Sequence, residues 1–107
     1  MLVAYAWDGS PLGCGAIRPL GDGVCEIKRM FALPGSKGVG HAVLEALERR
    51  AIEAGFVEAW LETRRVNDHA VRFYLGHAYR LIESYGKYRG RDECICLGKR
   101  LNTELPM

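Results

Sequence analysis

Residues 24–63 decide the fold, and they read VCEIKRMFA (24–32), LPGSKGVG (33–40), HAVLEALERRAIEA (41–54), G (55) and FVEAWLET (56–63). Residues 24–32 and 56–63 alternate from face to face as strands do. Residues 41–54 repeat apolar side chains at helical spacing, and Gly55 is a common helix terminator. A strand, a helix and a strand in this order form a right-handed crossover, so we expect two parallel strands. Strict alternation also predicts that Met30 shares a face with Glu26, opposite Ile27.

Further strands are predicted on both sides of this unit. Residues 2–7 and 11–20 are separated by Asp8-Gly9-Ser10, a hairpin signal because glycine takes positive φ without penalty. A second helix is expected to start near Asn67, a good N-cap residue, and to end near His77. Strands over 79–84 and 94–101 then enclose a polar loop, residues 85–93. The predicted fold is α/β (α+β): a mixed sheet with an antiparallel N-terminal meander, a βαβ unit, a second helix and a C-terminal strand pair.

Composition excludes several classes of protein. The chain has 107 residues, of which 49% are hydrophobic and 26% are charged, values typical of one globular domain. We expect that domain over residues 1–101 and a tail over 102–107. A net charge of +2 gives no nucleic-acid footprint. No apolar run predicts a membrane span or a signal peptide, so we expect a cytoplasmic protein. The four cysteines lack the spacing of a metal site, and we expect buried thiols and no metal.

The loop between the first two predicted elements of the βαβ unit carries three glycines, Gly35, Gly38 and Gly40. The N–H groups of the first turn of a helix have no partner within the helix, and glycines allow an anion to approach them closely. The spacing G-x-x-G-x-G is the reverse of a dinucleotide-binding fingerprint, and no Walker loop is present. Taken alone, the glycines are equally well explained by an ordinary strand-to-helix turn.

Two motifs together resemble the GNAT family of N-acetyltransferases. That family has a loop R/Q-x-x-G-x-G/A before a helix, matched here by residues 35–40 and the helical run 42–48. A second motif, N-x-x-A with a tyrosine and a final G-Y, is matched over residues 67–79. The chain departs from the family at Gly35, where the family has an Arg or Gln. In an alternative register, Lys37 takes the place of that arginine. The chain also departs at Ala78, where the family has a glycine. The resemblance covers residues 1–101 and implies a GNAT-like sheet in a short member without the usual N-terminal strand and helices.

The resemblance implies a site for acetyl-CoA as co-substrate, without a metal. Backbone groups of residues 30–32 would hold the thioester where two strands separate, and the glycine loop would bind the pyrophosphate. The implied coenzyme-binding residues are Met30, Phe31, Ala32, Gly35, Ser36, Lys37, Gly38, Val39, Gly40, His41, Asn67 and Tyr74.

Two catalytic residues are implied as well. Tyr74 is the expected general acid, and packing in the core explains it equally well. Glu26 is the expected base, with a pKa raised by apolar neighbours, and a solvated strand glutamate is the alternative. Asn67 is expected to contact the coenzyme, to cap the second helix, or to do both.

The function implied is transfer of an acetyl group from acetyl-CoA to a primary amine, on a small molecule or a protein, by direct attack. An alternative is a non-catalytic module of the same fold that binds or senses acyl-CoA, or that only dimerises. Residues 2–7 are predicted to form an exposed sheet edge, which proteins rarely leave bare. We therefore expect a homodimer, or a partner chain that covers the side where the usual N-terminal elements stand.

Overall fold

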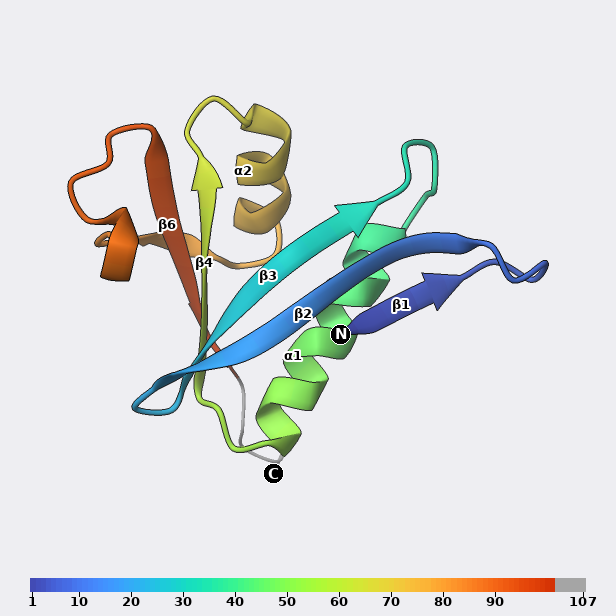
Figure 1. Cartoon of the computed structure of the whole chain (residues 1–107), viewed down its shortest axis with the longest axis horizontal. Coiled ribbons are helices and arrows are strands. Elements are labelled where there is room, and N and C mark those ends of the chain that lie inside the picture. Colours follow the sequence, from blue (N-terminus) through green and yellow to red (C-terminus); the bar gives the residue numbers. More distant parts are fainter. Residues whose placement is uncertain (102–107) are drawn as a thin grey trace.

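A six-stranded sheet carries two helices on one of its faces (Figure 1). The structure is a computed structural model that describes residues 1–101, and the predicted tail over 102–107 lies outside the described residues. Along the chain the elements are β1 (Leu2–Tyr5), β2 (Pro11–Gly21), β3 (Val24–Ala32), α1 (Val39–Glu53), β4 (Glu58–Arg64), α2 (Asp68–Leu75), β5 (Arg80–Ile82), a 3₁₀ turn η1 (Gly86–Tyr88) and β6 (Cys94–Arg100).

The sheet has the strand order β1-β2-β3-β4-β6-β5. β1, β2 and β3 form an antiparallel meander, and β3 pairs with β4 in the parallel sense that the crossover predicts. β6 inserts between β4 and β5 and is antiparallel to both. The predicted fold class is therefore confirmed, and β1 lies at an edge of the sheet, as expected.

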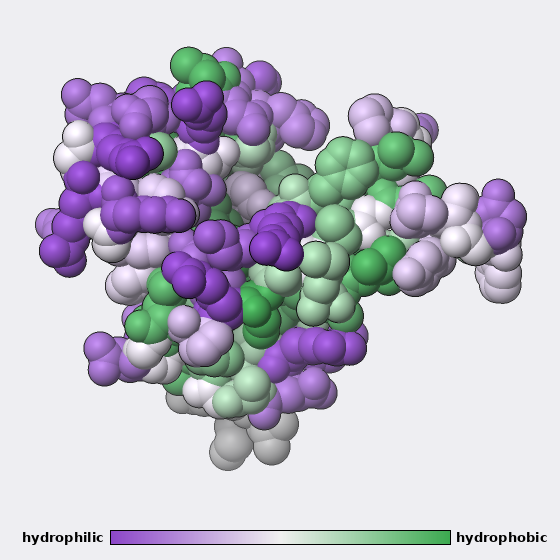
Figure 2. Space-filling model, viewed as in Figure 1, coloured by the Kyte–Doolittle hydropathy of each residue, from purple (hydrophilic) through white to green (hydrophobic). Residues whose placement is uncertain are grey.

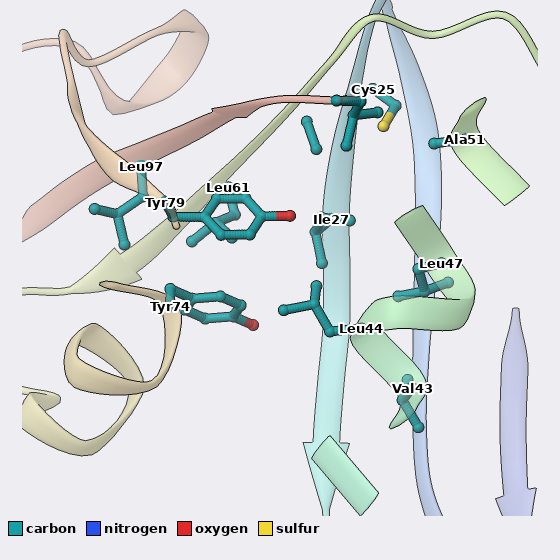
Figure 3. Close-up of a cluster of buried hydrophobic side chains, with 12 residues drawn as sticks. Cys25, Ile27, Val43, Leu44, Leu47, Ala51, Leu61, Tyr74, Tyr79 and Leu97 are labelled. Atoms are coloured by element: carbon teal, nitrogen blue, oxygen red, sulfur yellow. The ribbon is translucent and has the colours of Figure 1, made fainter. Parts of the chain in front are cut away.

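Both helices pack on the same face of the sheet, where the main core lies (Figure 3). α1 contributes Val43, Leu44, Leu47 and Ala51 from the apolar positions that the helical spacing predicts. Each fully buried leucine contributes roughly 1.5–3 kcal/mol to folding. Glu48 extends from the polar flank of α1, accepts a hydrogen bond from Tyr79 Oη at 2.8 Å and pairs with Lys99 Nζ at 2.9 Å. α1 is thereby fixed to β6 and to the segment that follows α2.

A β-bulge in β3 changes the predicted pattern of faces. Cys14 faces Phe31 while Ala16 faces Lys28, so β3 holds one residue more than β2 in this interval. Arg29 takes a positive φ of 57° there. The extra residue reverses the alternation, and Met30 turns toward α1. The prediction that Met30 shares a face with Glu26 is therefore wrong.

Residues from the predicted polar loop 85–93 cover β4 and β6 on the opposite face of the sheet. Tyr85 and Tyr88 pack on Cys94 and Cys96 there. The rings of Trp60 and Tyr85 lie 5.1 Å apart. Figure 2 shows this face, with apolar residues over the ends of β2 and β3 beside a more hydrophilic surface toward β6. Tyr85 and Tyr88 are therefore packed parts of the fold, whereas the other residues of the predicted loop 85–93 are exposed.

Predicted boundaries shift by a few residues at the ends of strands. The first strand ends at Tyr5, because Ala6 and Ser10 close a turn through a 2.8 Å backbone hydrogen bond. β5 covers only Arg80–Ile82 of the predicted 79–84. Neither helix of residues 1–101 combines the length and apolar character needed to cross a membrane. Those residues also bring no three metal-binding side chains together.

Candidate active site

The site lies where β3 and β4 separate. These strands pair only from Val24–Glu26 to Glu58–Trp60, although both continue further along the chain. Figure 1 shows β3 and β4 diverging beyond that point, with α2 above the gap. A cavity of about 700 Å³ lies at the end of β3 and the start of α1, and one of about 260 Å³ lies between the strands. Met30, Asn67, Ala70 and Tyr74 line both cavities.

The larger cavity contains most of the predicted coenzyme-binding residues. Those that line it are Met30, Phe31, Ala32, Gly35, Ser36, Gly38, Gly40, His41, Asn67 and Tyr74. Lys37 and Val39 are not among its lining residues. The side chain of Val39 instead points to β2, where a Cβ on Gly13 would lie only 2.7 Å from Val39 Cγ1.

The start of α1 presents backbone N–H groups to this cavity. Gly38 is the N-cap with a left-handed φ of 77°, and the first bond into the helix runs from Ala42 N to Gly38 O. The N–H groups of Val39, Gly40 and His41 therefore have no acceptor within the helix. A Cβ on Gly40 would lie 3.3 Å from the Phe73 ring, so this glycine lets α1 and α2 approach closely. Partial positive charge gathers at such a helix start and favours an anion.

Tyr74 combines a core ring with a hydroxyl that reaches the cavities. Its side chain is 8% exposed, and its ring packs edge-on against Phe73 and Tyr79. Figure 3 shows the ring of Tyr74 between α2 and Leu44, with the oxygen pointing away from the helix. Within residues 1–101 the hydroxyl makes no protein hydrogen bond. Burial raises the pKa of Tyr74 to about 12, so this hydroxyl keeps its proton at neutral pH.

Asn67 caps α2, as its residue type predicts. Its Oδ1 accepts a hydrogen bond from Ala70 N at 3.1 Å. The residue also lines both cavities. Capping and ligand contact are therefore compatible at this position.

Glu26 lies in surroundings that differ from both sequence-based alternatives. It is 1% exposed, so it is not a solvated glutamate. Its Oε1 accepts from Arg18 Nε at 2.7 Å and lies 3.7 Å from Lys28 Nζ, while Oε2 accepts from Tyr85 Oη at 2.6 Å. Burial alone raises the pKa of Glu26, but the hydrogen bonds from Tyr85 and Arg18 and the positive charges outweigh it, and the pKa lies below its ordinary value. The expected rise caused by apolar neighbours is wrong, because Arg18 and Tyr85 reach this carboxylate from distant parts of the chain.

A second carboxylate in the smaller cavity was not singled out as a site residue. Glu62 follows Trp60 on the same face of β4, and Glu26 pairs with Trp60, so both carboxylates lie on one side of the sheet. Burial and the neighbouring Glu62 carboxylate raise the pKa of the Cys94 thiol. Burial and the charges of Glu26 and Glu62 raise the pKa of Tyr88, which faces both. Spacing along β4 could have indicated the shared face, but not the cavity.

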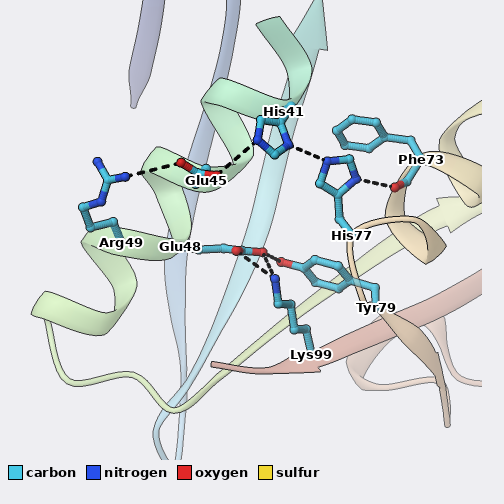
Figure 4. Close-up of polar contacts among 8 residues, drawn as sticks. All are labelled: His41, Glu45, Glu48, Arg49, Phe73, His77, Tyr79 and Lys99. Carbon is cyan, nitrogen blue, oxygen red and sulfur yellow. Dashed lines mark hydrogen bonds and ion pairs between the residues drawn. The ribbon is translucent and has the colours of Figure 1, made fainter. Parts of the chain in front are cut away.

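A chain of polar contacts connects α1 and α2 at the rim of the larger cavity (Figure 4). His77 Nδ1 lies 2.7 Å from Phe73 O, His77 Nε2 lies 2.9 Å from His41 Nδ1, and His41 Nε2 lies 3.1 Å from Glu45 Oε2. A carbonyl and a carboxylate only accept, so His77 donates from Nδ1 to Phe73 and His41 donates from Nε2 to Glu45. His77 is half-buried and holds His41 at the rim of the cavity.

Comparison with known proteins finds acetyltransferases. A sequence model of the acetyltransferase (GNAT) family matches residues 1–77. An uncharacterised N-acetyltransferase of Schizosaccharomyces pombe is 35% identical over 88 residues, which cover 79% of this chain and 54% of that protein. The chain thus spans about half the length of this curated relative.

Solved structures share the fold. A Klebsiella pneumoniae protein assigned as an acyl-CoA N-acyltransferase superposes with a TM-score of 0.87 at 26% identity, covering 92% of this chain and 70% of that one. The PaiA N-acetyltransferase of Thermoplasma acidophilum, solved in complex with coenzyme A, gives a TM-score of 0.77 at 20% identity, covering 92% and 58% of the two chains. The second likeness shows the fold alone.

Proposed function

Because the chain belongs to the acetyltransferase (GNAT) family, we propose that it transfers an acetyl group from acetyl-CoA to a primary amine by direct attack. One observation carries this proposal: the anion-binding cavity at α1 meets the smaller polar cavity at Tyr74. A donor held in the first cavity and an amine held in the second would meet beside this hydroxyl. Holding two reactants in this way converts their encounter into an effectively unimolecular step.

The larger cavity fits the coenzyme. Its volume of about 700 Å³ lies within the range of small-molecule sites, roughly 300–1,000 Å³. The N–H groups at the start of α1 would receive the pyrophosphate, and Gly38 leaves open space there because a Cβ would meet nothing within 4 Å. Beyond Glu26, β3 has no pairing to β4, so its backbone is available to hold the thioester. Acetyl-CoA, when bound, supplies an activated acyl group.

Tyr74 is proposed as the general acid. Its hydroxyl has no protein partner within residues 1–101, and its pKa of about 12 keeps it protonated across the neutral range. It would give its proton to the departing thiolate. A correctly placed acid of this kind contributes roughly 10²–10⁴-fold to a rate.

Calorimetry with acetyl-CoA tests the donor site, and thiol release over a panel of amines tests transfer. Gly38→Ala and Gly55→Ala form a matched pair, because both glycines have positive φ and open surroundings at opposite ends of α1. Each substitution is expected to cost about 1–2 kcal/mol of stability. Only Gly38→Ala should weaken acetyl-CoA binding. Absence of binding by the unmodified protein would contradict the proposal.

A non-catalytic acyl-CoA-binding module is the second candidate. The observation that favours it is Glu26, whose two oxygens are already engaged by Arg18 and Tyr85. Binding of acetyl-CoA without thiol release over the whole amine panel would select this candidate.

We also propose that a second copy of the chain pairs with β1. This strand is an edge of the sheet, and Val3, Tyr5 and Trp7 beside that edge are exposed. Sedimentation of the purified chain at several concentrations tests this directly, and a monomer at every concentration would contradict it.

A further inference from the structure

We propose that His77 carries a proton on both of its ring nitrogens at neutral pH, and that its positive charge links α2 to α1 at the rim of the larger cavity, where it favours a bound phosphate. His77 does not line that cavity, so it would act through His41, which does. The charge of His77 follows from the hydrogen-bond geometry, whereas its effect on a ligand rests on the proposed function.

Three contacts of the two imidazoles determine how many protons the pair holds (Figure 4). His77 Nδ1 lies 2.7 Å from Phe73 O, and His41 Nε2 faces Glu45 Oε2 at 3.1 Å. Both oxygens only accept, so each of these nitrogens carries a hydrogen. A neutral imidazole has a single N–H group, so two neutral rings would face each other with two lone pairs. Because His41 Nδ1 and His77 Nε2 lie 2.9 Å apart, a third proton lies between them.

The surroundings of the two rings place this third proton on His77. His77 follows the end of α2, where the helix carries partial negative charge that favours a cation. Its ring centre lies 4.4 Å from that of Phe73, and an aromatic ring attracts a cation within about 6 Å. His41 lies instead in the first turn of α1, where partial positive charge disfavours a cation. His77 is therefore the donor, and His41 the acceptor, in the contact between them.

The charge of His77 is not cancelled by the carboxylates of this region. Glu45 Oε1 lies 3.5 Å from Arg49 Nη2, and Glu48 Oε1 lies 2.9 Å from Lys99 Nζ, so each carboxylate has another cation as its partner. Among residues 1–101 neither imidazole forms a further hydrogen bond or ion pair. The other titratable groups on the segments around the pair are Lys37, Asp68, His69, Arg72, Tyr74, Tyr79 and Arg80. A net positive charge therefore remains at this rim.

The position of this charge suits an anion at the start of α1. The backbone N–H of His41 is one of the three at this helix start that have no acceptor within the helix. The rings of His41 and His77 lie 5.1 Å apart, so the positive charge lies one ring away from these N–H groups. A phosphate held by the N–H groups would also be attracted by His77.

Loss of the third proton would break the link between the helices at this point. His77 Nε2 would then face His41 Nδ1 with a second lone pair, and the positive charge would be gone. Histidine side chains change their charge between about pH 5 and 8. The larger cavity is therefore expected to hold a phosphate more weakly as the pH rises through this range.

Nitrogen NMR of the full chain with labelled histidines counts the protons directly, without a ligand. At neutral pH, His77 should have two protonated ring nitrogens and His41 one, at Nε2. His69 is an exposed histidine of α2 and serves as the internal reference. A single protonated nitrogen in His77 at neutral pH would overturn the inference.

Calorimetry with acetyl-dephospho-CoA tests the effect on a ligand, because the pyrophosphate of this analogue keeps its charge where histidines titrate. His77→Gln should weaken binding about 5-fold at neutral pH, the loss expected when one charge near an anion is removed at an exposed site. The pH dependence of binding should also become weaker. The amide that this substitution introduces can still donate to His41, so the variant removes the charge and keeps the contact.

Arg72→Gln is the matched control. It removes an exposed positive charge from α2, and Arg72 contacts neither imidazole and lines neither cavity. This variant should bind the analogue as the unmodified chain does. Equal affinity and pH dependence in His77→Gln and the unmodified chain, or an equal loss of affinity in Arg72→Gln, would overturn the inference. Failure of the unmodified chain to bind either acetyl-CoA or the analogue at any pH would instead contradict the proposed function, and the proton count of His77 would still decide the charge of the pair.

Discussion

Replacement of Tyr74 by phenylalanine separates the role of its hydroxyl from that of its ring. The ring packs in the core against Phe73 and Tyr79, and phenylalanine retains those contacts. The hydroxyl has no protein hydrogen bond within residues 1–101, so its removal leaves no buried group without a partner. We therefore expect the free energy of unfolding to change by about 1 kcal/mol or less.

The expected effect on turnover is much larger. If Tyr74 donates the proton to the departing thiolate, Tyr74→Phe lowers kcat by roughly 10²–10⁴-fold. That corresponds to about 2.7–5.4 kcal/mol in the activation free energy. Because the pKa of Tyr74 is about 12, loss of its proton should not limit the rate of the unmodified chain near neutral pH.

Thiol release measures turnover, calorimetry measures acetyl-CoA affinity, and urea unfolding measures stability. Tyr79→Phe is the matched control, because Tyr79 is a buried tyrosine of the same cluster that lines neither cavity. Its hydroxyl donates to Glu48 at 2.8 Å, so the control should lose about 1.5–3 kcal/mol of stability and keep its turnover. Full turnover in Tyr74→Phe would refute the role of the hydroxyl. Equal losses of stability, affinity and turnover would show that Tyr74 acts only through packing.

Three further results are expected. In the folded chain the pKa of Glu26 lies below its ordinary value of 4.5, so the Glu26 carboxylate stabilises the fold above that value and this contribution is lost as the pH falls through the folded pKa. The urea midpoint should therefore drop at acid pH, and it should drop less in Arg18→Met. An equal drop in both proteins would contradict the pairing of Arg18 with Glu26. Gly15→Ala places a Cβ 2.7 Å from Leu47 Cδ1 and should cost about 1–3 kcal/mol of unfolding free energy, and a neutral result would mean that the core adjusts freely there. Asn67→Asp keeps a capping oxygen and should keep the thermal midpoint, whereas Asn67→Ala should lose about 1 kcal/mol of unfolding free energy. The same midpoint in both variants would exclude a capping role. Reduced acetyl-CoA affinity in both variants would indicate direct contact of Asn67 with the coenzyme.

The lining of the larger cavity was largely predictable because its residues form two groups that are each close in sequence. The glycines at 35–40 lie between a strand and a helix, and their free N–H groups follow from the geometry of a helix start. Asn67 and Tyr74 belong to one short helix, whose cap and apolar face are visible in the sequence. Most of the residues that the family resemblance implies for coenzyme binding line this one cavity, and their role stays a prediction.

The bulge in β3 was not predictable in this way. A strand pattern with period two gives no signal for one inserted residue. Arginine is also not a residue type that favours a positive φ, although Arg29 adopts one. Pairing with β2 and packing of Met30 against α1 determine it. The inward turn of Met30 then brings this residue to the junction of the two cavities.

The sequence by itself determined the order of the elements, the parallel crossover and the glycine-rich turn before α1, because each depends on contacts between near neighbours in the chain. Only the tertiary structure decided the surroundings of the two carboxylates in the smaller cavity. Arg18 reaches Glu26 across a strand pair, and Tyr85 reaches it across 59 positions. These contacts engage the Glu26 carboxylate, whereas Glu62 in the same cavity forms no ion pair within 4 Å among the described residues. The charge state and availability of a buried group depend on what packs around it, and that is a property of the folded chain.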